Sequence, residues 1–221
     1  MMKLVFTMIL GMAIAFAAAS PAWASPADGK KTFEGQKCNA CHYTDGPARE
    51  KSIADQLAKK GPELWYAGSK FQRPWLEGWL AKPAPIRALA YNSLTEKNKG
   101  DHPKLAGADA KNVADFLMRL TTNEVKAGKI KPKKSLKGRQ VFTKKMPCTG
   151  CHRSAGRKGK VSGGISGPTL VGASKRLNPD WIFAYLKNPT HFKPFKPMPT
   201  FADILKAKDI KNVATYVATL K

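Results

Sequence analysis

The side chains in this sequence that are best suited to chemistry are four cysteines, which occur in two identical patterns. Cys38–His42 reads CNACH and Cys148–His152 reads CTGCH, so each pattern has two thiols followed directly by an imidazole. Two intervening residues place both sulfurs along one edge of a haem, where they form thioethers with its vinyl groups, and the next histidine reaches the iron. The predicted attachment residues are Cys38, Cys41, Cys148 and Cys151, and the predicted iron ligands are His42 and His152.

Paired cysteines have other uses, which this pattern favours less. Zinc ribbons also contain C-x-x-C pairs, but they do not require a histidine directly after each pair, and here the two pairs lie far apart. A thioredoxin-like redox pair belongs in a βαβ setting that the sequence lacks. Two disulfides are the general alternative in an oxidising compartment. The sequence therefore predicts two covalently bound haem c groups.

The N-terminus predicts export. Lys3 precedes an uncharged apolar run, Leu4–Ala19, and Ala22–Ala24 offers small residues at the positions that a signal peptidase reads. The run is short for a membrane span, so a cleaved signal peptide over residues 1–24 is favoured over a retained anchor. The mature chain then begins near Ser25 and contains no further stretch that is apolar and long enough to span a bilayer. The expected location is the periplasm.

The chain is strongly basic. Lys and Arg total 39 against 15 Asp and Glu, which gives a formal net charge of +24. Basic composition raises the question of nucleic acid, but an exported protein rarely meets any. We therefore expect acidic redox protein partners or an anionic membrane surface, and no nucleic acid. The remaining interpretation is that the positive charge only keeps the protein soluble.

The sequence after residue 24 contains one series of blocks twice. Both series run in the same order, which predicts an internal duplication with one C-x-x-C-H motif in each copy. The paired blocks are Gly29 and Phe33 with Gly138 and Phe142, Gly61–Leu64 with Gly167–Leu170, Ala67–Lys70 with Gly172–Lys175, Pro74–Pro83 with Asp180–Pro189, and Lys111–Leu117 with Lys211–Val217.

The spacing of apolar residues predicts an all-α fold. Trp75, Trp79 and Leu80 share one helical face, as do their counterparts in the second copy, and a proline ends each segment. No segment shows convincing strand alternation. The basic, glycine-rich segment Arg153–Gly164 has no counterpart, and its glycines argue against a fixed local structure.

The duplication predicts two domains, over residues 25–125 and 136–221. Between them, residues 126–135 form a linker rich in lysine and proline. Repulsion between the lysines, together with the glycine and proline, favours a solvated, extended chain there.

With these motifs, the mature chain resembles the class I cytochromes c over essentially its whole length, in the tandem arrangement of dihaem cytochromes of the c4 type. The resemblance implies two cytochrome c-like domains. It also implies that the carbonyls of Pro62 and Pro168, in the two glycine-proline blocks, accept hydrogen bonds from the haem histidines His42 and His152. Such contacts fix the orientation of a ligand ring and raise its basicity.

The resemblance also points to a loop before each closing helix as the source of the sixth iron ligand. In the second copy, Met198 stands between prolines and looks like the family's distal methionine; His191 is the rival. The first copy has no methionine in this loop, and His102 lines up with Met198. His102 is therefore the expected ligand, with an exposed loop histidine as the alternative; Met118, within the closing helix, is best interpreted as core packing.

The different axial ligands expected at the two haems predict a direction of electron transfer. Histidine–methionine ligation raises the potential of a haem, so the first, bis-histidine haem is expected below the second. We expect a periplasmic electron carrier with no catalytic residues, which moves electrons from the first haem to the second. The alternatives are a small dihaem oxidoreductase or peroxidase-like enzyme, and a fixed electron-transfer subunit of a respiratory complex.

Overall fold

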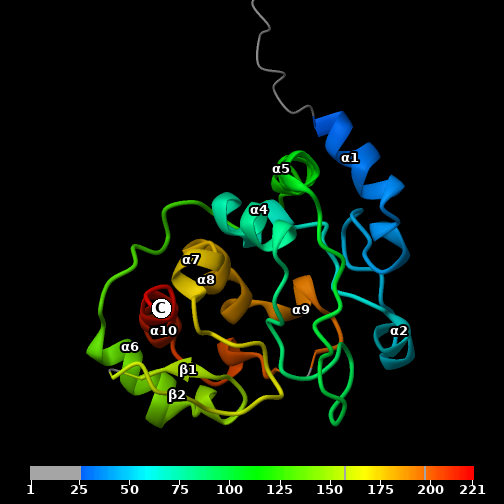
Figure 1. Ribbon diagram of the computed structural model, residues 1–221. Coiled ribbons are helices and arrows are strands. Elements are labelled where there is room, and N and C mark those ends of the chain that lie inside the picture. Colours follow the sequence, from blue (N-terminus) through cyan, green and yellow to red (C-terminus); the bar gives the residue numbers. More distant parts are fainter. Residues whose placement is uncertain (1–25, 157, 197) are drawn as a thin grey trace, which may run out of the picture.

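Helices make up most of the ordered elements in the computed structural model (Figure 1). The structure describes residues 26–156, 158–196 and 198–221; the predicted signal peptide and Pro197 lie outside them. At the level of fold class, this helix-dominated architecture confirms the all-α prediction. None of the helices in these ranges is both long and apolar enough to cross a membrane.

The same kinds of element follow one another in the first half of the chain (residues 26–125) and in the second half (residues 136–221). The first half contains α1 (Pro26–Gly35), the 3-10 turn η1 (Cys38–Ala40), α2 (Ile53–Ala58), α3 (Ala67–Lys70), α4 (Arg73–Ala81) and α5 (Gly107–Met118). The second half contains α6 (Leu136–Gln140), the π-helical η2 (Val141–Lys145), the 3-10 turn η3 (Cys148–Gly150), β1 (Ser154–Ala155), β2 (Val161–Ser162), α7 (Ala173–Arg176), α8 (Pro179–Lys187), α9 (Pro189–Phe192), the 3-10 turn η4 (Phe201–Asp203) and α10 (Ala207–Val217).

In both halves, a glycine of the first helix lies against the closing helix. A Cβ atom on Gly29 would lie 2.1 Å from the backbone oxygen of Asn112, and one on Gly138 would lie 2.1 Å from that of Asn212. The two asparagines occupy equivalent positions in the repeated blocks. The glycines therefore let α1 approach α5, and α6 approach α10, to within backbone contact. The repeated sequence thus makes a repeated contact.

Replacing Gly138 by alanine should destabilise the protein by about 2 kcal/mol, because the new methyl group meets backbone atoms that move only if the helices separate. Gly78 is the matched control: it lies within α4 and a Cβ there has no neighbour within 4 Å. Gly78→Ala should instead stabilise by about 0.5–1 kcal/mol, by reducing the freedom of the unfolded chain. Urea denaturation of both variants measures these changes, and equal stabilities would contradict the prediction.

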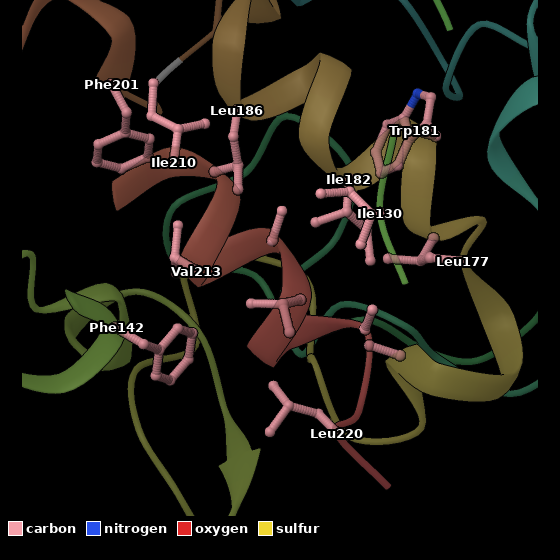
Figure 2. Close-up of a cluster of buried hydrophobic side chains, with 14 of the residues drawn as sticks. Ile130, Phe142, Leu177, Trp181, Ile182, Leu186, Phe201, Ile210, Val213 and Leu220 are labelled. Atoms are coloured by element: carbon pink, nitrogen blue, oxygen red, sulfur yellow. The ribbon is translucent and has the colours of Figure 1, made fainter. Parts of the chain in front are cut away.

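Buried apolar side chains form two clusters. One lies within the first half and includes Phe33 and Val113. The other surrounds α10, and Figure 2 shows Phe142 pointing toward that helix from the neighbouring segment. Trp65 and Tyr66 come from the first half but belong to this second cluster. Apolar packing therefore joins the two halves.

The segment between the halves differs from the predicted solvated chain at one residue. Its lysines are exposed, but Ile130 is only 5% exposed and packs in the second cluster (Figure 2). The carboxylate of Asp180, in the first turn of α8, accepts hydrogen bonds from the amides of Gly128 and Ile130 at 2.8 and 2.7 Å. Burial of one isoleucine contributes roughly 2 kcal/mol, which is enough to anchor the middle of an otherwise charged segment.

The glycine-rich segment after the second cysteine motif also differs from the prediction. Instead of lacking a fixed local structure, it contains the short antiparallel pair β1 and β2, in which Ser154 faces Ser162. Gly159 has a φ of +77° in the connecting turn, a conformation that favours glycine. The glycines, which we expected to prevent a fixed structure, instead permit a tight turn. The strands are too short to show an alternation of polar and apolar residues in the sequence.

The two halves also meet at equivalent positions, where the residues that follow α3 and α7 form an isolated antiparallel β-bridge. The amide of Gln72 donates to the carbonyl of Arg176 at 2.9 Å, and the amide of Asn178 donates to that of Lys70 at 2.8 Å. When the tryptophan helices are aligned, Lys70 corresponds to Arg176 and Gln72 to Asn178. The two hydrogen bonds are therefore related by an approximate twofold axis.

Candidate haem-binding sites

Both C-x-x-C-H motifs fold as a single turn that ends on the histidine. In η1, the carbonyl of Cys38 accepts hydrogen bonds from the amides of Cys41 and His42 at 3.1 and 3.0 Å, and the same two bonds recur in η3 at 3.2 and 2.9 Å. The four cysteines are free thiols; the first of each pair is half-buried and the second is exposed. The two turns thus present their sulfurs and imidazoles in matching ways.

The imidazoles of these turns are held by the glycine-proline blocks. Nδ1 of His42 lies 2.7 Å from the carbonyl oxygen of Pro62, and Nδ1 of His152 lies 2.7 Å from that of Pro168. Because a carbonyl oxygen only accepts hydrogen bonds, Nδ1 carries the proton and Nε2 keeps its lone pair. Burial lowers the pKa of both histidines and outweighs these hydrogen bonds, so both rings are neutral at neutral pH. A neutral ring with a free Nε2 is the form that binds iron.

The glycine that precedes each of these prolines makes room for the ring. A Cβ atom on Gly61 would lie 2.7 Å from Cε1 of His42, and one on Gly167 would lie 2.6 Å from Cε1 of His152. Both distances are shorter than any side chain tolerates. The glycine-proline pair therefore does two things at each site: its first residue admits the imidazole, and its second orients it.

His102 faces the first of these histidines. The ring centres of His42 and His102 lie 6.1 Å apart, and Nδ1 of His102 lies 2.8 Å from the carbonyl oxygen of Pro103, which leaves Nε2 free. Two imidazoles bound to opposite sides of one metal ion, with metal–nitrogen bonds of about 2 Å, have ring centres about 6 Å apart. The observed spacing fits a shared iron. His102 is exposed and packs against Trp79 of α4, with ring centres 4.7 Å apart.

The two candidates for the second site lie in different surroundings. Met198 is half-buried and packs against the core around α10. His191 is in α9 and packs edge-on against Trp65 and Phe192, with ring centres 5.6 and 5.2 Å away. Its Nε2 is buried and has no hydrogen-bond partner among the described residues. Aromatic rings of both halves thus enclose His191, whereas Met198 borders the core of the half that contains His152.

Several buried donors near the contact between the halves have no partner among the described residues. They include Nε1 of Trp65, Nε1 of Trp181 and Nε of Arg87. Arg176 is 5% exposed, and within the described ranges its guanidinium group donates only to the carbonyls of Thr169 and Val171. Buried donors of this kind need hydrogen-bond acceptors, and a buried cation is stabilised further when the acceptor is negatively charged. The two carboxylates that every haem carries supply such acceptors, so this chemistry also fits haem.

A buried ionic cluster beside the first site was not predicted from the sequence. The Glu63 side chain is fully buried, and its carboxylate lies 2.5 Å from Nζ of Lys59 and 3.0 Å from Nζ of Lys193, while the hydroxyl of Tyr66 donates to it at 2.7 Å. Lys59 also pairs with Glu50 at 2.5 Å. The only signal in the sequence is a glutamate in one glycine-proline block where the other has Thr169.

Burial by itself would raise the pKa of Glu63. The charges of Lys193 and Lys59, with hydrogen bonds from Lys59 and Tyr66, outweigh burial and lower this pKa to about 2. Glu63 is therefore ionised at every physiological pH. It follows Pro62 directly, so a permanent negative charge lies next to the carbonyl that orients His42.

Comparison with known proteins gives a family match for the second half of the chain. Residues 135–221 match the family model described as Cytochrome c. No curated protein sequence matches the chain. Among solved structures, the chain is similar to a chain of the Kuenenia stuttgartiensis reducing HAO-like protein complex Kustc0457/Kustc0458, with 16% sequence identity, coverage of 86% of this chain and 94% of that chain, and a TM-score of 0.33.

The family match contains Cys148, Cys151 and His152 within a helical frame. Among the described residues, no group of three or more His, Cys, Asp and Glu side chains is arranged to hold a bare metal ion, as a zinc site would require. The match over residues 135–221 supports a c-type cytochrome, and a match to this family implies covalently bound haem c.

Proposed function

We propose that the chain is an exported dihaem electron carrier, built from two cytochrome c-like domains over residues 25–125 and 136–221. The observation that carries this proposal is the repetition of the whole histidine site: the same turn, the same glycine contact and the same 2.7 Å contact between histidine and proline in both halves. In the first site, Cys38 and Cys41 would hold the haem and His42 and His102 would ligate its iron. In the second site, Cys148 and Cys151 would hold it, with His152 and Met198 as ligands.

Haem c, when bound, supplies one-electron chemistry. Pro62 and Pro168 orient His42 and His152, and with His102 and Met198 as further ligands neither iron would keep an open coordination site for a substrate. Axial ligation by methionine raises a haem potential relative to ligation by two histidines. With both haems bound, electrons would therefore pass from the first site to the second, through halves that are in direct contact.

The partners we propose are acidic redox proteins in the periplasm. The net charge of +24 favours fast, salt-sensitive encounter with such proteins more than tight binding. An anionic membrane surface satisfies the same charge, and binding to anionic vesicles in parallel with acidic cytochromes would separate the two.

A haem count and a spectrum of the purified chain test the proposal. We expect two haems per chain by the pyridine haemochrome method, and a near-infrared charge-transfer band of iron–methionine ligation with about half the intensity of a chain in which both irons bind methionine. We also expect the protein in the periplasmic fraction, without residues 1–24. One haem per chain, or no methionine band, would overturn the corresponding part of the proposal.

A further inference from the structure

Each half inserts one cation beside the glycine-proline turn of the other half. Arg87 and Lys193 occupy the same position in the repeat, shortly after the proline that ends the tryptophan helix. Nη2 of Arg87 donates to the carbonyl of Ser166 at 2.7 Å, directly before the turn that orients His152. Nζ of Lys193 lies 3.0 Å from the carboxylate of Glu63, directly after the turn that orients His42. The two contacts are reciprocal.

The charges at the first turn are balanced. Lys193 and Lys59 contribute two positive charges, and Glu63 and Glu50 contribute two negative charges, within ion-pair distances of 2.5–3.0 Å. The exposed fractions of these four side chains are 20%, 11%, 0% and 4%, so solvent screens the pairs only weakly. The cation that the second half inserts is therefore neutralised where it lies.

The charges at the second turn are not balanced. Thr169 occupies the position of Glu63, and its amide donates to the carbonyl of Ile86 at 2.8 Å, which fixes the inserted segment in place. Neither Arg87 nor Arg176 forms an ion pair within the described ranges, and Nε of Arg87 is buried without a partner there. No carboxylate of the protein within the described ranges therefore offsets the charge of Arg87.

The equivalent residues Lys70 and Arg176 also differ in how strongly they hold a positive charge near the two turns. Burial, followed by the charge of Lys193, lowers the pKa of Lys70 to about 7, so its charged form is favoured less than that of an exposed lysine. Burial lowers the pKa of Arg176 only to about 10, so the guanidinium group keeps its charge. Within the described ranges, the second turn therefore carries two arginine charges without a carboxylate partner, whereas carboxylates pair with Lys59 and Lys193 at the first turn.

We propose that Arg87, supplied by the first half, raises the reduction potential of the haem held by His152, and that Glu63 prevents Lys193 from doing the same to the haem held by His42. An oxidised haem site carries one more positive charge than the reduced site, so a half-buried cation that no carboxylate of the protein neutralises favours reduction. Both haems carry the same carboxylates, and thus the difference arises from the protein. This inference rests on the proposed function. It adds a half-buried charge to axial ligation as a second reason for electron transfer from the first haem to the second.

Redox titration of the complete holoprotein tests the inference, with the second haem followed through its methionine band. At the potential where the second haem of the wild type is half reduced, Arg87→Gln should lower the ratio of reduced to oxidised second haem about three- to tenfold. This is the effect of one charge acting over about 12–25 Å at an effective dielectric constant of about 20. The first haem should shift less. Glu63→Gln should raise the potential of the first haem and leave the second nearly unchanged.

Two control variants separate charge from structure. Arg87→Lys keeps the charge and should retain the wild-type potential, whereas Arg49→Gln removes an exposed arginine paired with Asp45 and should shift neither haem. Equal shifts of both haems in Arg87→Gln, no shift of either, or equal shifts in Arg87→Lys and Arg87→Gln would overturn the inference. A wild-type protein with one haem, or with two haems of equal potential, would instead overturn the proposed function, because that result does not involve Arg87.

Discussion

Replacing His102 by alanine should allow the reduced protein to bind carbon monoxide at one of its two haems. On the proposed ligation the wild type should bind little, because His102 and Met198 would each ligate one of the two irons. In His102→Ala, about half of the haem absorbance should respond to carbon monoxide, while the methionine band of the second haem stays unchanged. The His102 side chain is exposed, so its loss should cost little stability.

His191 provides the matched control for this experiment. It is the second histidine outside the C-x-x-C-H motifs, and it packs among Trp65 and Phe192 instead of facing His42. His191→Ala should therefore leave carbon monoxide binding and the methionine band as in the wild type. If the wild type binds carbon monoxide as completely as His102→Ala does, His102 is not a ligand, and the enzymatic alternative with an open iron site gains support.

Replacing Glu63 by glutamine should lower the free energy of unfolding at pH 7 by about 3 kcal/mol, because it breaks a buried ion pair and leaves Lys193 without an acidic partner in the part of the chain that the structure describes. The pKa of Glu63 falls from 4.5 to about 2 on folding. The stabilisation is therefore complete above about pH 4.5 and disappears as the pH falls toward 2. Between these values, the wild type should lose stability more steeply than the variant.

Urea denaturation at several pH values between 2 and 7 measures both effects of Glu63→Gln. Glu34→Gln is the control, since Glu34 is about half exposed and pairs with Lys30 at 3.8 Å. That variant should stay within about 0.5 kcal/mol of the wild type at pH 7. Parallel pH profiles for the wild type and Glu63→Gln would show that Glu63 does not confer the acid sensitivity.

Features that depend on neighbours in sequence were predictable from the sequence. The spacing within Cys38–His42 and Cys148–His152 determines the turn chemistry locally, and the helical fold class follows from the spacing of tryptophans such as Trp75 and Trp79. The contact of His42 with Pro62 came from a family resemblance, since a glycine-proline pair by itself indicates only a turn.

Features that depend on distant residues were not predictable. Glu63 and Lys193 come from different halves, and lysines throughout a basic chain give no signal that one of them enters an ionic cluster. Ile130 was assigned to a solvated linker because its neighbours are lysines, yet one apolar side chain reaches the core. In both cases, tertiary packing decided what local composition did not.

The β-bridge between Phe71 and Leu177 has a further consequence. A contact in which equivalent residues meet is isologous, the kind of contact that two identical subunits form about a twofold axis. In a homodimer of single-haem chains, every substitution occurs at both copies, so the two redox centres always remain identical. Joining the copies in one chain keeps the geometry and removes this constraint. Glu63 and Thr169, like His102 and Met198, are differences between equivalent positions that a homodimer of identical chains cannot have.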